Sequence, residues 1–247
     1  MDKQTTNRVE LAIAWTGPLC ILGYIIFWGI MGHNIPPPNF VGMSAEQLIT
    51  EHYGKYQNSI AIGMAATCVI GLLYLPWSCQ LASMLRNDDG SMGVLSLMEY
   101  AGGILTAWVL AFCPAIWLVC AIYATELDPA IIKTIHSFTW YIYDMTFMIT
   151  TIQLTGLGVF TVLSTKQAIF PAWTGWGAIA VGVIFMPLIL IAFVVDGPFA
   201  VGGTWNFFIV FGTWLFLFFA PYSYFMIREL SRRGQSMRSA YSAAHAL

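Results

Sequence analysis

Residues 94–123 read VLSLMEYAGGILTAWVLAFCPAIWLVCAIY, and this stretch decides the fold class. It is 30 residues long and carries a single charged side chain, Glu99. A helix needs about 20 mostly apolar residues to cross the hydrocarbon core of a bilayer, so this stretch is long enough to span it. Its apolar residues are continuous, whereas a strand of a membrane β-barrel alternates apolar and polar residues. The sequence therefore predicts a transmembrane helix here.

The chain contains five more long apolar stretches, each bounded by charged or turn-forming residues. Together they give six predicted spans, at about 11–32, 58–84, 94–123, 138–164, 174–195 and 205–228. The composition agrees, because 58% of the residues are hydrophobic and 9% are charged, whereas a soluble domain carries about 25% charged residues. We predict an all-α polytopic membrane protein, with a six-helix transmembrane domain over residues 1–230 and a cytoplasmic tail over residues 231–247.

The basic residues predict how the helices are oriented. If the N-terminus is cytoplasmic, the inner side holds Lys3, Arg8, Arg86, Lys166, Arg228, Arg232, Arg233 and Arg238, and the outer side holds Lys55 and Lys133. Loops rich in lysine and arginine stay on the cytoplasmic side. We therefore expect a multi-pass protein of the cell (inner) membrane with both termini in the cytoplasm. Membrane lipids are its expected surroundings, and no nucleic-acid partner is expected.

A short amphipathic helix is predicted outside the membrane, over residues 44–57. Ser44-Ala45-Glu46-Gln47 fits a capping box, in which the serine and the residue three positions later bond each other's backbone N–H. Apolar and aromatic residues then recur at helical spacing. Two interpretations stay open: a lid that packs over the bundle, or a gate over a cavity.

Asp144 is one of two carboxylates placed clearly within the predicted spans. A charged group at membrane depth costs about 2.5–3.5 kcal/mol on insertion scales, so its position carries information. On one continuous helix, Trp140, Thr151 and Thr155 fall within about 40° of Asp144. This stripe is either a packing face or part of a site, and we expect Asp144 to face a polar cavity enclosed by protein and open to the outside.

Glu99 is the second carboxylate, and it lies one or two turns from the inner edge of its helix. The favoured interpretation is a carboxylate that reaches water or pairs with Arg86. Gly102-Gly103 on the same helix predicts a close approach by a neighbour. His136 is interpreted as a structural histidine at the membrane surface.

The candidate site residues follow from these faces. The candidates for acid–base chemistry are Asp144, Glu99 and Asp196. The candidates for ligand binding are Asp144, Trp140, Thr151, Thr155, Trp117, Thr67 and Tyr74. Histidines, cysteines and carboxylates do not recur at metal-ligand spacing, and no nucleotide or nucleophile motif is present. We therefore predict no metal and no cofactor.

Three short motifs resemble a family of uncharacterised six-helix bacterial membrane proteins. They are Ile35-Pro36-Pro37-Pro38 followed by Ser44-Ala45-Glu46, Phe170-Pro171-Ala172-Trp173-Thr174-Gly175-Trp176, and Gly197-Pro198-Phe199-Ala200. The resemblance implies a fold and no activity. Asp196-Gly197 is similar to a motif of integral membrane terpene cyclases, but the second acid of that family has no match here, so the similarity is not extended to function.

Three functions remain open. The first is binding or transport of a lipophilic small molecule between the helices. The second is an accessory subunit of a larger membrane complex, in which the small-residue faces contact a protein partner or another copy of the chain. The third is a membrane-embedded acid–base enzyme for a lipid-like or terpenoid-like substrate, so whether the chain is an enzyme stays open.

Overall fold

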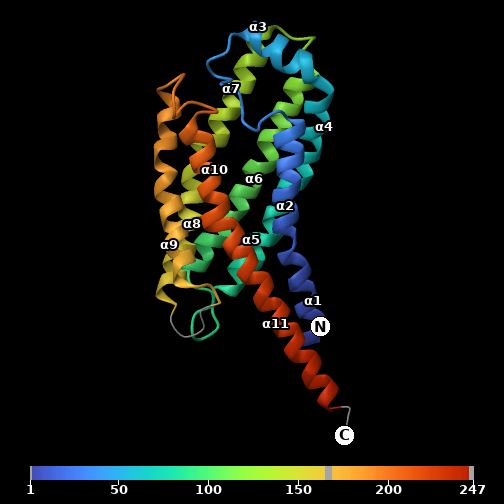
Figure 1. Cartoon of the computed structure of the whole chain (residues 1–247), viewed down its shortest axis with the longest axis vertical. Helices are drawn as coiled ribbons and strands as arrows, with labels where there is room; N and C mark the ends of the chain where they lie inside the picture. Colours follow the sequence, from blue (N-terminus) through green and yellow to red (C-terminus); the bar gives the residue numbers. More distant parts are fainter. Residues whose placement is uncertain (1, 165–168, 245–247) are drawn as a thin grey trace.

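The structure is a computed structural model that describes residues 2–164 and 169–244, with side chains described as far as residue 239. Its described residues form an elongated bundle of helices with no strand (Figure 1). Six helical stretches are long and apolar enough to span a membrane. They are Lys3–Met31, Ala45–Met84, Val94–Ile122, Pro129–Leu163, Ala172–Ala192 and Thr204–Ser239. The predicted all-α fold with six membrane helices is confirmed.

The first and last helical stretches pack together at the end where both termini lie, the lower end in Figure 1. The first consists of α1 (Lys3–Ala14), α2 (Thr16–Tyr24) and a π-helical turn, η1 (Ile25–Met31). The last consists of η4 (Thr204–Ile209), α10 (Val210–Thr213), η5 (Trp214–Phe219) and α11 (Ala220–Ala244). Asn7 of α1 donates to the carbonyl of Leu230 in α11 at 3.1 Å. Helix α11 continues through most of the predicted tail.

The second stretch joins the predicted external helix to a membrane span. It consists of α3 (Ala45–Gln47), η2 (Leu48–Tyr53), α4 (Gly54–Gly71) and α5 (Tyr74–Met84). The capping box is confirmed: Gln47 N–H donates to Ser44 Oγ at 3.1 Å, and Ser44 N–H donates to Gln47 Oε1 at 2.9 Å. A non-helical residue, Tyr56 (φ −129°, ψ 18°), then turns the chain into the bundle. Because Leu48 and Tyr53 are fully buried, the helix predicted to be external packs on the end of the bundle as a lid.

Helix α6 (Val94–Ile122) is the central element and contacts α4, α5, α7 and α8. Its glycines permit close contacts. A Cβ added at Gly103 would lie 1.7 Å from Ser78 Oγ of α5, and one added at Gly102 would lie 2.5 Å from the Cβ of Gln153 in α8. The predicted close approach at Gly102-Gly103 is therefore confirmed, and it comes from two neighbouring helices.

The fourth stretch starts earlier than predicted and is broken in the middle. Helix α7 (Pro129–Met145) begins nine residues before position 138, because Asp128 caps it by accepting from Ala130 N–H at 2.8 Å. Helix α8 (Phe147–Leu163) follows after Thr146, whose backbone (φ −80°, ψ 11°) is not helical. Positions before and after this break do not share one helical projection.

The fifth stretch consists of α9 (Ala172–Ile184) and a 3-10 segment, η3 (Met186–Ala192). Helix α9 packs tightly on α8, where a Cβ added at Gly158 would lie 2.7 Å from the carbonyl oxygen of Gly175. The small residues of α8 that face α9 are thus a packing face.

Candidate functional site

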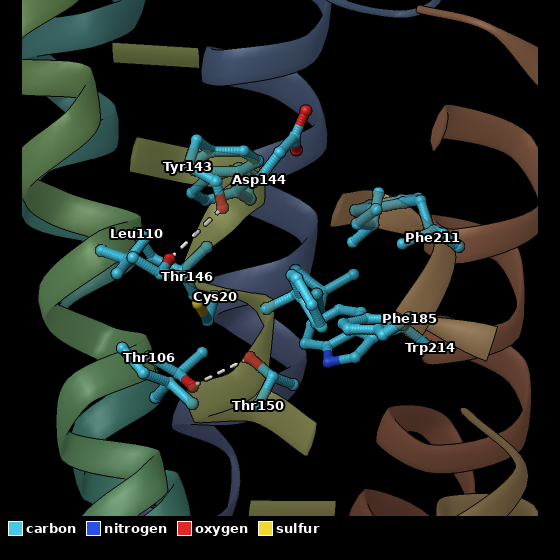
Figure 2. A pocket seen from close by; sticks show the side chains of 17 residues that line it. Cys20, Thr106, Leu110, Tyr143, Asp144, Thr146, Thr150, Phe185, Phe211 and Trp214 are labelled. Atoms are coloured by element: carbon cyan, nitrogen blue, oxygen red, sulfur yellow. Dashed lines mark hydrogen bonds between the residues drawn. The ribbon is translucent and has the colours of Figure 1, made fainter. Parts of the chain in front are cut away.

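A cavity of about 120 Å³ lies inside the bundle beside the α7–α8 break. Residues of α2, α6, the α7–α8 junction, the end of α9 with η3, and α10 with η5 line it. Its walls are mostly apolar, and Figure 2 shows Phe185, Phe211 and Trp214 opposite Leu110 of α6. Asp144 of α7 and Thr150 of α8, on either side of the break at Thr146, both line this cavity.

Asp144 is the one carboxyl group among the residues that line this cavity. Its side chain is buried, and Oδ2 accepts from Asn206 Nδ2 at 2.9 Å. Asn206 is in turn oriented by the backbone, because its Oδ1 accepts from Gly202 N–H at 3.1 Å. In the described parts of the chain no cation forms an ion pair with Asp144. Its polar partner is the uncharged amide of Asn206.

The expectation for Asp144 is half confirmed. The residue is turned toward protein and has a polar partner, as expected. The cavity is apolar rather than polar, so that part of the expectation is wrong. The reason is the break at Thr146, which turns Thr151 and Thr155 away from Asp144.

Thr151 and Thr155 lie outside the cavity lining. Thr151 Oγ1 donates to the carbonyl of Gly182 in α9 at 3.3 Å, and Thr155 Oγ1 donates to the carbonyl of Thr151 at 2.7 Å. The threonines that line the cavity are instead Thr106, Thr146 and Thr150. Thr106 and Thr150 form a hydrogen bond of 3.3 Å, visible as a dashed line in Figure 2.

Trp140 and Trp117 lie next to the cavity in an aromatic cluster. Their ring centroids are 4.9 Å apart, and both rings contact Tyr143, which lines the cavity. Tyr143 also stacks on Trp28 of η1, with centroids 5.9 Å apart. Trp140 and Trp117 therefore support a wall residue and do not themselves line the cavity.

His136 is buried in the same cluster, although we expected it at the membrane surface. The helix begins at Pro129 and the lid covers it, so His136 is 2% exposed. Trp140 Nε1 donates to His136 Nε2 at 3.0 Å, and Tyr53 Oη lies 2.6 Å from Nδ1. Because an indole N–H can only donate, Nε2 must accept and the proton lies on Nδ1. His136 is thus an uncharged structural residue that connects the lid to α7.

Glu99 is fully buried, so the prediction of a solvated or Arg86-paired carboxylate is wrong. Ser78 Oγ and Gln153 Nε2 each donate to Glu99 Oε1 at 2.9 Å, and Oε2 has no hydrogen-bond partner among the described residues. Arg86 instead donates to the carbonyl of Ser83. The physical cause is Gly102-Gly103, which lets α5 and α8 close over the carboxyl group.

The remaining candidates are dispersed. Tyr74 Oη donates to Gln153 Oε1 at 3.2 Å and so belongs to the Glu99 group. Thr67 Oγ1 donates to the carbonyl of Gly63 in its own helix at 2.7 Å. Asp196 is exposed. The structure therefore does not bring the three candidate acids together.

Comparison with family models, with curated proteins and with solved structures gives no match for this chain. The resemblance to six-helix bacterial membrane proteins stays a prediction. Among the described residues, no group of three or more histidine, cysteine and carboxylate side chains is placed to hold a metal ion.

Proposed function

We propose that the protein binds a lipophilic small molecule in the cavity beside Asp144 and moves it within or across the membrane. The observation that carries the proposal is an apolar cavity among the helices with a single buried carboxyl group on its wall. Small-molecule sites have this composition: apolar walls with a few placed polar groups that fix the orientation of the ligand.

The walls indicate the chemistry of the ligand. Phe185, Phe211 and Trp214 would contact an apolar body, and Asp144 and Thr150 would accept from a hydroxyl or amine. An apolar cavity of about 150 Å³ holds benzene. The cavity, with its volume of about 120 Å³, therefore has room for one ring or one branched alkyl segment of the ligand.

The test uses benzyl alcohol, which combines one ring with one hydroxyl, as the probe. Saturation-transfer NMR on the purified protein should detect binding that is lost in Val210→Phe, because the larger ring fills the cavity from α10. Val183→Phe is the matched control, since Val183 is 63% exposed on the outer surface of α9. Equal signals from the two variants would contradict the proposal.

We also propose the inner membrane of a bacterium as the location, with both termini in the cytoplasm. The orientation is supported by the ratio of eight inner to two outer basic residues. In a chain without its five native cysteines, single cysteines at Asn39 and Leu127 should react with an impermeant thiol reagent added outside intact cells. Cysteines at Asn87 and Gln235 should react only after lysis. Labelling of a cysteine at Gln235 in intact cells would contradict the proposed orientation.

An accessory subunit and an acid–base enzyme stay predictions. The enzyme has the weaker support of the two, because Asp144, Glu99 and Asp196 have separate surroundings.

A further inference from the structure

Glu99 has an unusual environment for a carboxyl group. It is fully buried, both of its hydrogen-bond donors contact Oε1, and within the part of the chain that the structure describes Oε2 has no hydrogen-bond partner. The titratable groups that face it are Tyr74 and Cys79 of α5 and Tyr222 of α11. In residues 2–164 and 169–239 no lysine, arginine or histidine forms an ion pair with it.

This environment favours exchange of a proton over binding of a metal ion. A buried carboxylate without a cation carries a large desolvation penalty, which a proton removes. A bound Na⁺, Mg²⁺ or Ca²⁺ would need several acceptor oxygens directed at one point. The groups nearest Glu99 Oε1 are instead a serine hydroxyl and an amide N–H, and both donate to it.

Gln153 connects Glu99 to the cavity. Its Nε2 donates to Glu99 Oε1 at 2.9 Å, and its Oε1 accepts from Thr106 Oγ1 at 3.2 Å. Thr106 in turn forms the 3.3 Å hydrogen bond with Thr150, and both threonines line the cavity. A continuous chain of side-chain hydrogen bonds therefore runs from the buried carboxyl group to the cavity wall.

The direction of every bond in this chain depends on the proton of Glu99. An ionised carboxylate can only accept, so Gln153 must present its N–H to Glu99 and its oxygen to Thr106. Thr106 then donates to Gln153 and accepts from Thr150, which leaves the lone pairs of Thr150 toward the cavity. A protonated Glu99 can donate to the amide oxygen, so the amide can rotate and each hydroxyl can reverse. The Tyr74 hydroxyl, which donates to the same amide oxygen at 3.2 Å, would then accept from the amide N–H as Thr106 does. Thr150 would then donate into the cavity.

We propose that Glu99 is a proton-binding site and that its proton reverses the hydrogen-bond direction of the chain Gln153–Thr106–Thr150 at the cavity wall. One proton is taken up from water and returned to water, and no covalent bond other than the O–H bond changes. The proton site stands independently of any ligand. Its effect on a ligand rests on the function proposed above, because it makes the wall an acceptor in one state and a donor in the other.

Infrared titration of the protein in lipid vesicles tests the proton site directly. The difference spectrum between acid and alkaline buffers should contain the carbonyl band of a protonated carboxylic acid that is absent from Glu99→Gln and retained in Asp144→Asn. The band should fall about tenfold for each pH unit above its midpoint. Identical difference spectra from wild type and Glu99→Gln would overturn the proposal. This test uses no cavity ligand, so it can fail while benzyl alcohol still binds.

Two neighbouring threonines test the connection to the cavity. Thr150→Val removes the last hydroxyl of the chain and should move the midpoint of the Glu99 band by about half a pH unit. Thr151→Val is the matched control, because Thr151 bonds Gly182 of α9 and lies outside the chain. It should leave the midpoint unchanged. Equal midpoints in both variants would overturn the reversal of the chain.

Discussion

Replacing Gly103 by alanine should separate α5 from α6 and destabilise the bundle. The added Cβ would lie 1.7 Å from Ser78 Oγ and 2.5 Å from Ser78 Cβ, whereas ordinary contact begins at 3.4 Å. The hydroxyl alone must therefore move by 1.7 Å, the difference between 3.4 and 1.7 Å. Rotation of Ser78 does not resolve the contact with its Cβ, so the helices must move as well.

The magnitude follows from two contributions. Overpacking of a well-filled interior costs about 1–3 kcal/mol. The displaced Ser78 also loses its hydrogen bond to Glu99, which is worth roughly 1 kcal/mol. We therefore expect a loss of about 2–4 kcal/mol in the free energy of unfolding. For a chain of this size that corresponds to a fall of roughly 4–16 °C in Tm.

Thermal unfolding of the purified protein in detergent, followed by circular dichroism, is the assay. Gly212→Ala is the matched control, because a Cβ at Gly212 has nothing within 4 Å, and alanine should stabilise α10 by about 0.5–1 kcal/mol. Ser78→Gly combined with Gly103→Ala should recover part of the lost stability. If Gly103→Ala and Gly212→Ala gave the same Tm, the close approach of α5 to α6 would be refuted.

Three further predictions concern the lid and the loop before it. Ser44→Ala removes the helix cap and should cost about 1 kcal/mol, seen as faster amide hydrogen exchange in the first turn of the lid. Tyr53→Phe leaves the Nδ1–H of His136 buried without a partner and should lower the free energy of unfolding by about 1–3 kcal/mol, measured by thermal unfolding. Partial burial and the charge of Lys55 hold the pKa of His33 below its usual 6.5. In NMR titrations Lys55→Gln should therefore raise that pKa, but not to 6.5, because burial remains.

Local rules explain what the sequence predicts well. The six spans follow from the length of the apolar stretches, and the start of the lid follows from the spacing of Ser44 and Gln47, which is a contact within one turn. The predicted start of the fourth span at position 138 is nine residues late, because Lys133, Thr134, His136 and Ser137 interrupt the apolar stretch, although Asp128-Pro129 is a helix-start signal.

The site depends on contacts between helices, which periodicity within one helix does not determine. Glu99 lies near a helix end in sequence, but α5 and α8 close over it at Gly102 and Gly103. The paired glycines are a usable signal of this closure. The break at Thr146 had no comparable signal, so the projection from Asp144 to Thr155 failed. Asn206, an amide in an apolar span, could have been recognised as a buried partner.

The walls of the cavity differ in the regularity of their helices and in how closely those helices pack. Glycines bring α8 into close contact with α9 and with α6. The wall that carries Phe211 and Trp214 belongs to a stretch where α10 is flanked by the π-helical turns η4 and η5. Such turns are rare and are concentrated at functional positions, since they interrupt the regular hydrogen-bond ladder. Irregular turns also adjoin the walls formed by α2, which continues into η1, and by η3, so a displacement that opens a route between the cavity and the lipid would involve these segments rather than α6.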